Sequence, residues 1–122
     1  MATDHFWGYH TIIDAAGCDP EAISNKNTIA EFNATLIKEI DMVAYGEPQI
    51  VQFGVGDMIG YTLVQLIETS NINCHFVDVP RTMYLDVFSC KTYDHNIVTK
   101  LVKQFFSPKS IRTTFLIRHA HE

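Results

Sequence analysis

Two segments with helical spacing interrupt a chain whose other apolar residues come in short runs of β-branched and aromatic types. The first predicts a helix over residues 27–42, because apolar side chains recur every three or four positions. Those side chains are Ile29, Phe32, Leu36, Ile37 and Ile40. The second predicts a helix that begins within 91–94 and ends at Phe106, before Ser107-Pro108. Two such helices among β-rich runs favour a mixed fold of helices and strands.

The β-rich runs predict five or six strands, separated by turn residues such as Gly17-Cys18-Asp19-Pro20. The expected strands are His5–Ile13, Gln49–Phe53, Tyr61–Thr69, Ile72–Val77, Met83–Cys90 and Ile111–Ile117. Short connections between residues 61 and 90 favour antiparallel pairing. The expected fold class is α/β in the α+β sense, a two-layer sandwich with two helices on one face of a mostly antiparallel sheet. Because the 122 residues contain no linker or repeat, residues 1–122 are expected to form a single domain.

Charge and cysteine usage exclude several classes of protein. Nine Lys and Arg against fourteen Asp and Glu give a net charge of −5, which offers no basic face for nucleic acid or an anionic membrane. No apolar run reaches the ~18 residues of a membrane span, and residues 1–5 lack the basic start of a signal peptide. The three cysteines, Cys18, Cys74 and Cys90, form no C-x-x-C pair. A cytoplasmic protein without a disulfide framework or a structural zinc site is expected.

Single residues in the centre of the chain allow ordinary structural interpretations. A lone histidine in an apolar strand, such as His75, is more often a hydrogen-bonded core residue than a base or ligand. A strand cysteine such as Cys90 is usually a small core residue. The polar stretch Glu68-Thr69-Ser70-Asn71 interrupts two apolar strands and fits a surface hairpin. His119 and His121 fit a solvated tail, and no metal site is expected.

Taken together, these central residues carry a resemblance. The run 60–70, then His75, then Asp86-Val87-Phe88-Ser89-Cys90, resembles the small bacterial pyruvoyl-dependent S-adenosylmethionine decarboxylases. In that family a serine is followed five residues later by a histidine and fifteen further on by a cysteine. The steps from Ser70 to His75 to Cys90 are the same, without gaps. Residues 8–14 and Gly17-Cys18 also resemble the family's first strand and turn, so the similarity spans most of the chain.

The resemblance implies a self-cleaving proenzyme for spermidine and polyamine synthesis. Ser70 would attack the carbonyl of Thr69, and the chain would be cut between residues 69 and 70. Position 70 would then carry a pyruvoyl cofactor, which accepts electrons as carbon dioxide leaves, as a pyridoxal cofactor does elsewhere. By the same resemblance, His75 is the base of self-processing and Cys90 the acid that reprotonates the substrate carbon. Thr62 matches a family serine near the prosthetic group, and Glu68 is a candidate charge partner.

The spacing sets a geometric requirement. Ser70 and His75 differ by an odd number, so on one continuous strand they face opposite sides of the sheet. For His75 to reach Ser70, the chain is expected to bend at Ser70-Asn71. A tight bend without glycine there would also store strain that favours rearrangement of the Thr69–Ser70 bond.

Three departures from the family pattern keep other functions open. Thr69 stands where the family has glutamate, and Asn71 stands where it has histidine. After His75, the stretch Phe76-Val77-Asp78-Val79 replaces an aromatic residue and a proline–glutamate pair that help hold adenosine. One alternative is a pyruvoyl-dependent arginine or ornithine decarboxylase on the same scaffold. Another is an unprocessed, non-catalytic relative that acts as a binding or regulatory subunit. The family also implies a homodimer of processed protomers, with the site completed near the subunit interface.

Overall fold

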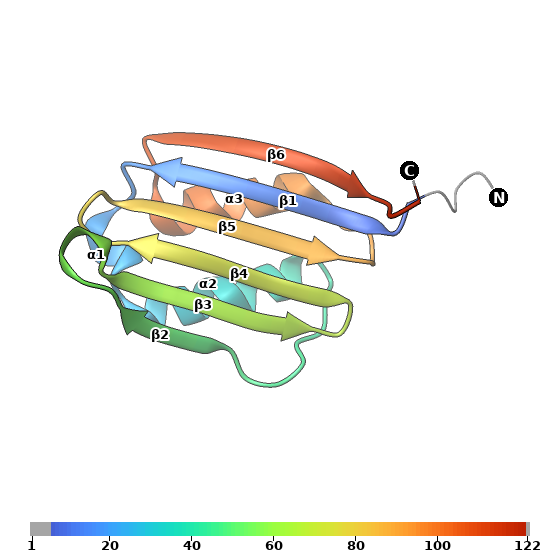
Figure 1. The fold of residues 1–122 in the computed structure, drawn as a ribbon, viewed down its shortest axis with the longest axis horizontal. Coiled ribbons are helices and arrows are strands. Elements are labelled where there is room, and N and C mark those ends of the chain that lie inside the picture. The colour runs from blue at the N-terminus through green and yellow to red at the C-terminus, as the bar shows by residue number, and fades with distance from the viewer. Residues whose placement is uncertain (1–5, 122) are drawn as a thin grey trace.

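The computed structural model describes residues 6–121, which form one six-stranded sheet with helices against one of its faces (Figure 1). The strands are β1 (Gly8–Ala16), β2 (Gln49–Phe53), β3 (Gly60–Ile67), β4 (Ser70–Val77), β5 (Thr82–Ser89) and β6 (Ser110–Arg118). The helices are α1 (Pro20–Ile23), α2 (Lys26–Glu39) and α3 (His95–Phe106), and a 3₁₀ turn, η2 (Gly56–Met58), precedes β3. The strand order is β2-β3-β4-β5-β1-β6, and every neighbouring pair is antiparallel. The expected two-layer α+β sandwich is confirmed.

Several element boundaries differ from the sequence-based prediction. β1 extends to Ala16 instead of ending at Ile13, and His5, where the strand was expected to begin, lies outside the described residues. Residues 17–20 are not only a loop, because α1 begins at Pro20, with the Asp19 carboxylate accepting the Ala22 N–H at 3.1 Å. One helical turn is too short to show a periodic pattern, which is why the sequence did not reveal it. α2 ends at Glu39 instead of residue 42, since Asp41 adopts a φ of 60°.

The two long helices form because each has a side-chain cap and one apolar face. The Asn25 side chain accepts the N–H groups of Asn27 and Thr28 at the start of α2, and Asp94 accepts the Asn96 N–H at the start of α3. Both apolar faces are buried against the sheet, and the Phe106 ring joins the layers, 5.0 Å from Phe32 and 5.3 Å from Phe76. No helix within residues 6–121 is long and apolar enough to cross a membrane.

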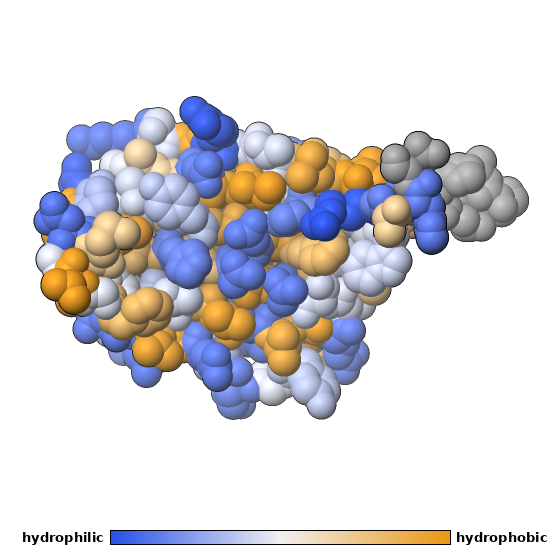
Figure 2. Space-filling model, in the orientation of Figure 1, coloured by the Kyte–Doolittle hydropathy of each residue, from blue (hydrophilic) through white to orange (hydrophobic). Residues whose placement is uncertain are grey.

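The other face of the sheet carries no helix, and we call it the open face (Figures 1 and 2). Side chains alternate along each strand, so every second residue points to this face. It mixes polar groups with large apolar side chains that are partly or largely exposed. The apolar ones include Val64 and Leu66 on β3, Tyr84 on β5 and Leu116 on β6, which are 37–52% exposed. Residues of β3 alternate in this way, with Leu63, Gln65 and Ile67 buried on the helix side.

Candidate active site

The bond predicted to break lies at the end of a hairpin. Glu68 and Thr69 form the two-residue turn between β3 and β4. β3 therefore ends at Ile67, two residues before the predicted end, and β4 begins at Ser70, two residues before the predicted start. The carbonyl oxygen of Thr69 accepts the backbone N–H of Cys90 at 3.0 Å, and Ser70 is the register partner of Ser89. Residues 19 and 21 positions apart in the sequence therefore meet at one end of these two central strands.

Cys90 lies just after the last residue of β5 and is exposed, so its interpretation as a core residue is wrong. A close approach of β1 creates this position. A Cβ added to Gly8 would lie 2.3 Å from the Ser89 carbonyl oxygen and 2.9 Å from the Cys90 Cα, so only glycine fits there. The thiol is accordingly open to a substrate, whereas those of Cys18 and Cys74 are fully buried.

The side chain of Thr69 is held from the helix side of the sheet. Its hydroxyl is 2.7 Å from the hydroxyl of Ser89, a residue with no exposed surface. Ser89 also accepts the Lys91 N–H at 2.9 Å, and both hydroxyls point toward the sulfur of Met42, at 3.4 and 3.6 Å. This cluster could not be predicted from the sequence, because its members come from three separate segments, around residues 42, 69 and 89–91. Glu68 is exposed in the turn, and its backbone N–H donates to the Val43 carbonyl.

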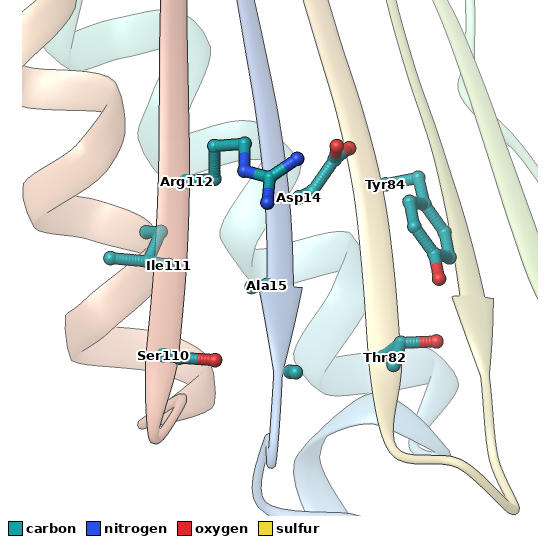
Figure 3. A pocket seen from close by; sticks show the side chains of 8 residues that line it. Asp14, Ala15, Thr82, Tyr84, Ser110, Ile111 and Arg112 are labelled. Carbon is teal, nitrogen blue, oxygen red and sulfur yellow. The ribbon is translucent and has the colours of Figure 1, made fainter.

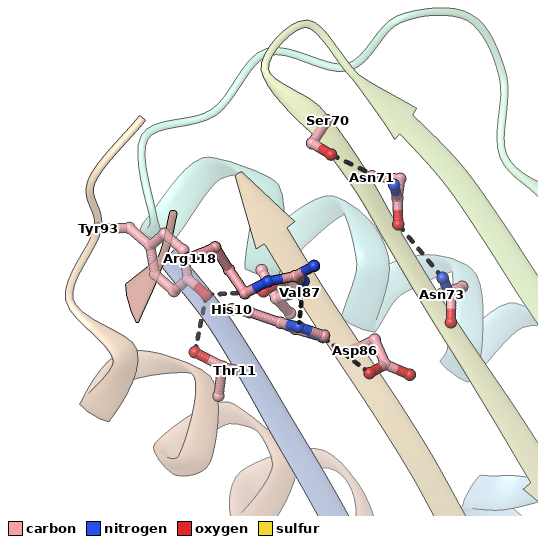
Figure 4. A network of polar contacts seen from close by, with 9 residues as sticks. All are labelled: His10, Thr11, Ser70, Asn71, Asn73, Asp86, Val87, Tyr93 and Arg118. Carbon is pink, nitrogen blue, oxygen red and sulfur yellow. Dashed lines mark hydrogen bonds and ion pairs between the residues drawn. The ribbon is translucent and has the colours of Figure 1, made fainter. Parts of the chain in front are cut away.

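The expected bend at Ser70-Asn71 does not occur. β4 is a regular strand from Ser70 to Val77, and no peptide bond in the described chain is cis. The non-glycine residues with positive φ are Asp41, Arg81 and Ser107, all away from the hairpin. Stored backbone strain at residues 69–71 is therefore removed as an explanation for cleavage. The Ser70 hydroxyl accepts a hydrogen bond from Asn71 Nδ2 at 3.3 Å (Figure 4).

His75 lies in the same strand, five residues from Ser70. It is exposed on the open face, so the core interpretation is wrong, and its Nδ1 is 3.1 Å from the hydroxyl of Thr62 on β3. Ser70 has the parity of Ile72 and Cys74, which face the helices. At ~3.3 Å per residue, the two residues are about 16 Å apart along the strand. The structure thus pairs Thr62 with His75, and residues 69–70 with Cys90, but it does not bring His75 to Ser70 within one chain.

A hollow of about 350 Å³ lies on the sheet between residues of β5, β1 and β6 (Figure 3). In the register, His75 lies beside Tyr84, Tyr84 beside Asp14, and Asp14 beside Arg112. The last three of these residues line the hollow, together with Thr82 and Ser110. An acidic and a basic side chain are thus presented a short way across the sheet from the imidazole.

A second group of side chains, near Cys90, was missed from the sequence. His10 Nε2 is 3.0 Å from the Asp86 carboxylate, and Arg118 donates to His10 Nδ1 at 3.1 Å (Figure 4). Arg118 also lies 4.7 Å above the centre of the Phe88 ring, and the exposed Trp7 ring lies 5.4 Å from Phe88. Alternation places His10 and Asp86 on one face, but nothing in the sequence pairs residues 76 positions apart.

Burial raises the pKa of four groups in the described chain, one of which is the phenol of Tyr93. It raises the pKa of the Cys18 thiol to about 11 and that of Cys74 well above its usual value. Burial also raises the pKa of Asp78, whose Oδ1 is shielded from solvent and has no hydrogen-bond partner in the described chain.

Phe76 is 2% exposed and packs in the core, so this ring does not face a ligand.

The fold and this arrangement define a class: a two-layer α+β protein with a serine–histidine–cysteine set on antiparallel strands. The family model for S-adenosylmethionine decarboxylase matches residues 9–119. The S-adenosylmethionine decarboxylase proenzyme of Pyrococcus furiosus is 32% identical over 83 residues, covering 68% of this chain and 57% of the relative. That of Thermococcus kodakarensis is 28% identical over 100 residues, covering 80% of this chain and 67% of the relative.

The fold also resembles a crystal structure of the adenosylmethionine decarboxylase from Aquifex aeolicus. The TM-score is 0.79 at 23% identity, with 96% of this chain and 94% of the other covered, which supports the shared fold. The chain spans little more than half the length of the Pyrococcus furiosus relative. Since the family model covers most of the chain, the chain belongs to the S-adenosylmethionine decarboxylase family.

Proposed function

We propose that this chain is a proenzyme that cleaves itself between Thr69 and Ser70 and then decarboxylates S-adenosylmethionine for spermidine and polyamine synthesis. The observation that carries the proposal is the hydrogen bond from the Cys90 N–H to the Thr69 carbonyl, at 3.0 Å. That carbonyl is the group that the Ser70 hydroxyl would attack. A backbone donor on its oxygen stabilises the negative charge that develops during the attack.

Position 70 fits the formation of a pyruvoyl group. Ser70 supplies the required hydroxyl, and the residue is at the end of a strand, where a new chain end can separate without breaking the sheet. The pyruvoyl group supplies an electron-accepting carbonyl. The exposed thiol of Cys90, beside the cleavage site, is the donor that returns a proton to the substrate carbon.

The groups around the site suit this substrate. S-adenosylmethionine carries a sulfonium cation and an adenine ring, and aromatic faces bind both kinds of group. Trp7, whose neighbour Gly8 approaches Cys90, offers an exposed aromatic face of this kind.

We also propose that the active form is a homodimer joined through the open face. Ser70 and His75 do not meet in one chain, so each site needs the histidine of a second copy. The exposed apolar side chains of the open face, among them Leu66, Tyr84 and Leu116, favour burial against another protein.

The free thiols of Cys18, Cys74 and Cys90 fit a reducing compartment, such as the cytoplasm.

A denaturing gel with mass spectrometry tests cleavage. The wild-type chain is expected to give fragments 1–69 and 70–122, and Ser70→Ala is expected to stay intact while keeping its fold. Fragments from Ser70→Ala at the same position would show that the Ser70 hydroxyl is not the nucleophile of cleavage.

Mixing two inactive chains tests the shared site. Neither Ser70→Ala nor His75→Ala is expected to cleave alone. In a mixed dimer, the Ser70→Ala chain provides His75 to the intact Ser70 of the other chain, so the His75→Ala chain is expected to cleave. A His75→Ala chain that stays intact in a verified mixed dimer contradicts the shared site.

A second candidate substrate is a basic amino acid, arginine or ornithine. The buried position of Phe76 favours it, because the stretch that helps hold adenosine in the family offers no aromatic face here. Parallel decarboxylation assays with S-adenosylmethionine, arginine and ornithine separate the two. No decarboxylation of any of them by an uncleaved chain would favour a binding or regulatory subunit instead.

A further inference from the structure

Three polar side chains at the start of β4 form a directed chain of hydrogen bonds. Asn73 Nδ2 donates to Asn71 Oδ1 at 3.2 Å, and Asn71 Nδ2 donates to Ser70 Oγ at 3.3 Å (Figure 4). Because the oxygen of the Asn71 amide is occupied by Asn73, its NH₂ group is turned toward Ser70. The Ser70 oxygen therefore accepts, and its own proton is free to leave.

The surroundings of Asn71 strengthen this contact. Its neighbours across the sheet are Leu66 on β3 and Phe88 on β5, so two apolar side chains flank a half-buried amide. A hydrogen bond between such groups is stronger than one in water, because fewer solvent dipoles compete for it.

The inference rests on the proposed self-cleavage, whose steps assign the final position of each oxygen. In the first step Ser70 Oγ bonds to the Thr69 carbonyl carbon, the C–N bond breaks, and the hydroxyl proton passes to the Ser70 nitrogen. In the second step a base removes the Ser70 α-proton, and the Cβ–Oγ bond breaks with its electron pair on Oγ. The released Thr69 carboxylate then contains its original carbonyl oxygen and Oγ. Water hydrolyses the dehydroalanine left at position 70, with loss of ammonia.

Each of these two oxygens already has a donor in the intact chain. The Cys90 N–H holds the carbonyl oxygen at 3.0 Å, and the Asn71 NH₂ holds Oγ at 3.3 Å. The geometry points to Asn71 as a catalytic residue of cleavage, which stabilises the negative charge on Oγ as the Cβ–Oγ bond breaks. Asn73 is a positioning residue that keeps the amide turned the right way. A histidine at position 71, as in the family pattern, can also donate an N–H.

The test follows cleavage after refolding from denaturant, with wild type beside Asn71→Ala, Asn71→Asp, Asn71→His and Asn73→Ala. Loss of a hydrogen bond to a charged oxygen is expected to slow cleavage about 10- to 100-fold in Asn71→Ala and Asn71→Asp. Asn71→His is expected to cleave faster than either, since it restores a donor. Asn73→Ala, a change on the same strand and face, is expected to slow cleavage less than Asn71→Ala does. The Asn71 NH₂ group is still present in this variant but is no longer held toward Ser70.

Hydroxylamine distinguishes a role in the second step from a structural role. It cleaves the ester that precedes elimination and leaves unmodified serine at the start of fragment 70–122, which mass spectrometry detects. Asn71→Ala is expected to accumulate this ester, with a melting temperature close to that of Ser70→Ala. Cleavage of Asn71→Ala at the wild-type rate, or slow cleavage without accumulated ester, overturns the role of Asn71. A wild-type chain that never cleaves overturns the proposed function, and this inference with it.

Discussion

The buried hydroxyl cluster behind the cleavage site predicts a measurable coupling between Thr69 and Ser89. Ser89→Ala removes the 2.7 Å bond to Thr69 and leaves the Lys91 N–H without its 2.9 Å acceptor. At about 1 kcal/mol for each net hydrogen bond, and with Ser89 fully buried, the expected loss is about 2 kcal/mol of unfolding free energy. Thr69→Val removes the shared bond and the weak 3.4 Å contact with the Met42 sulfur but leaves the Lys91 N–H paired, so its expected cost is about 1 kcal/mol.

Urea unfolding in a Ser70→Ala background measures this in an uncleaved chain. Since both single changes remove the same hydrogen bond, the double variant is expected to lose about 1 kcal/mol less than the sum of the two. The exposed pair Thr99–Thr113, whose hydroxyls are 3.2 Å apart, is the matched control and is expected to couple by less than about 0.5 kcal/mol. If the loss in the double variant equals the sum of the losses in Ser89→Ala and Thr69→Val to within about 0.3 kcal/mol, the stabilising role of the bond is refuted.

Three further predictions concern single side chains. In the folded protein, iodoacetamide near pH 8 is expected to label Cys90 and to spare Cys18 and Cys74, because burial raises the pKa of both of these thiols. Peptide mapping measures the labelling, and labelling of Cys74 at the same rate as Cys90 would contradict the prediction. Asp78→Asn is expected to stabilise the fold at pH 7, because burial raises the pKa of Asp78 and so disfavours its ionised form in the folded protein. The wild-type protein therefore has its full stability below pH 3.8, where Asp78 is protonated, and loses part of it as the pH rises through the folded-state pKa. The gain over wild type should therefore vanish in acid, and unfolding curves with a gain independent of pH argue against it. Cys90→Ala is expected to cleave normally but lose activity during turnover, because no thiol returns the proton; the mass of fragment 70–122 before and after substrate, with a progress curve, tests it, and wild-type inactivation kinetics exclude the role.

Local patterns predicted the layers of this fold well. The period of residues 29–40 identified α2, and the β-rich run of residues 49–53 identified β2, because these signals are carried by neighbouring side chains. The short helix α1 has too few residues for such a signal. The turn at 68–69 was recognised as a polar interruption, but its position one residue before Ser70 depends on pairing with β3 and β5.

The candidate site was less accessible to sequence reasoning, because its contacts join distant segments. A family resemblance carried by their spacing selected Ser70, His75 and Cys90, and the structure brings the backbone of Cys90, but not His75, to the cleavage site. The hydroxyl pair of Thr69 and Ser89 and the pair His10–Asp86 depend on strand order, which neither composition nor periodicity specifies.

The separation of Ser70 from His75 follows from the strand itself. On a regular strand, a five-residue step turns the second side chain to the opposite face and carries it about 16 Å along the sheet. A bend in β4 would have solved this, but β4 pairs without interruption with both β3 and β5, and a bend would break hydrogen bonds on both sides. The chain therefore keeps its central strand straight and leaves its histidine on an uncovered face. In the proposed homodimer, a second copy placed against that face would supply the missing base without changing the fold of either chain, and the mixed-dimer experiment is the most direct test of that assembly.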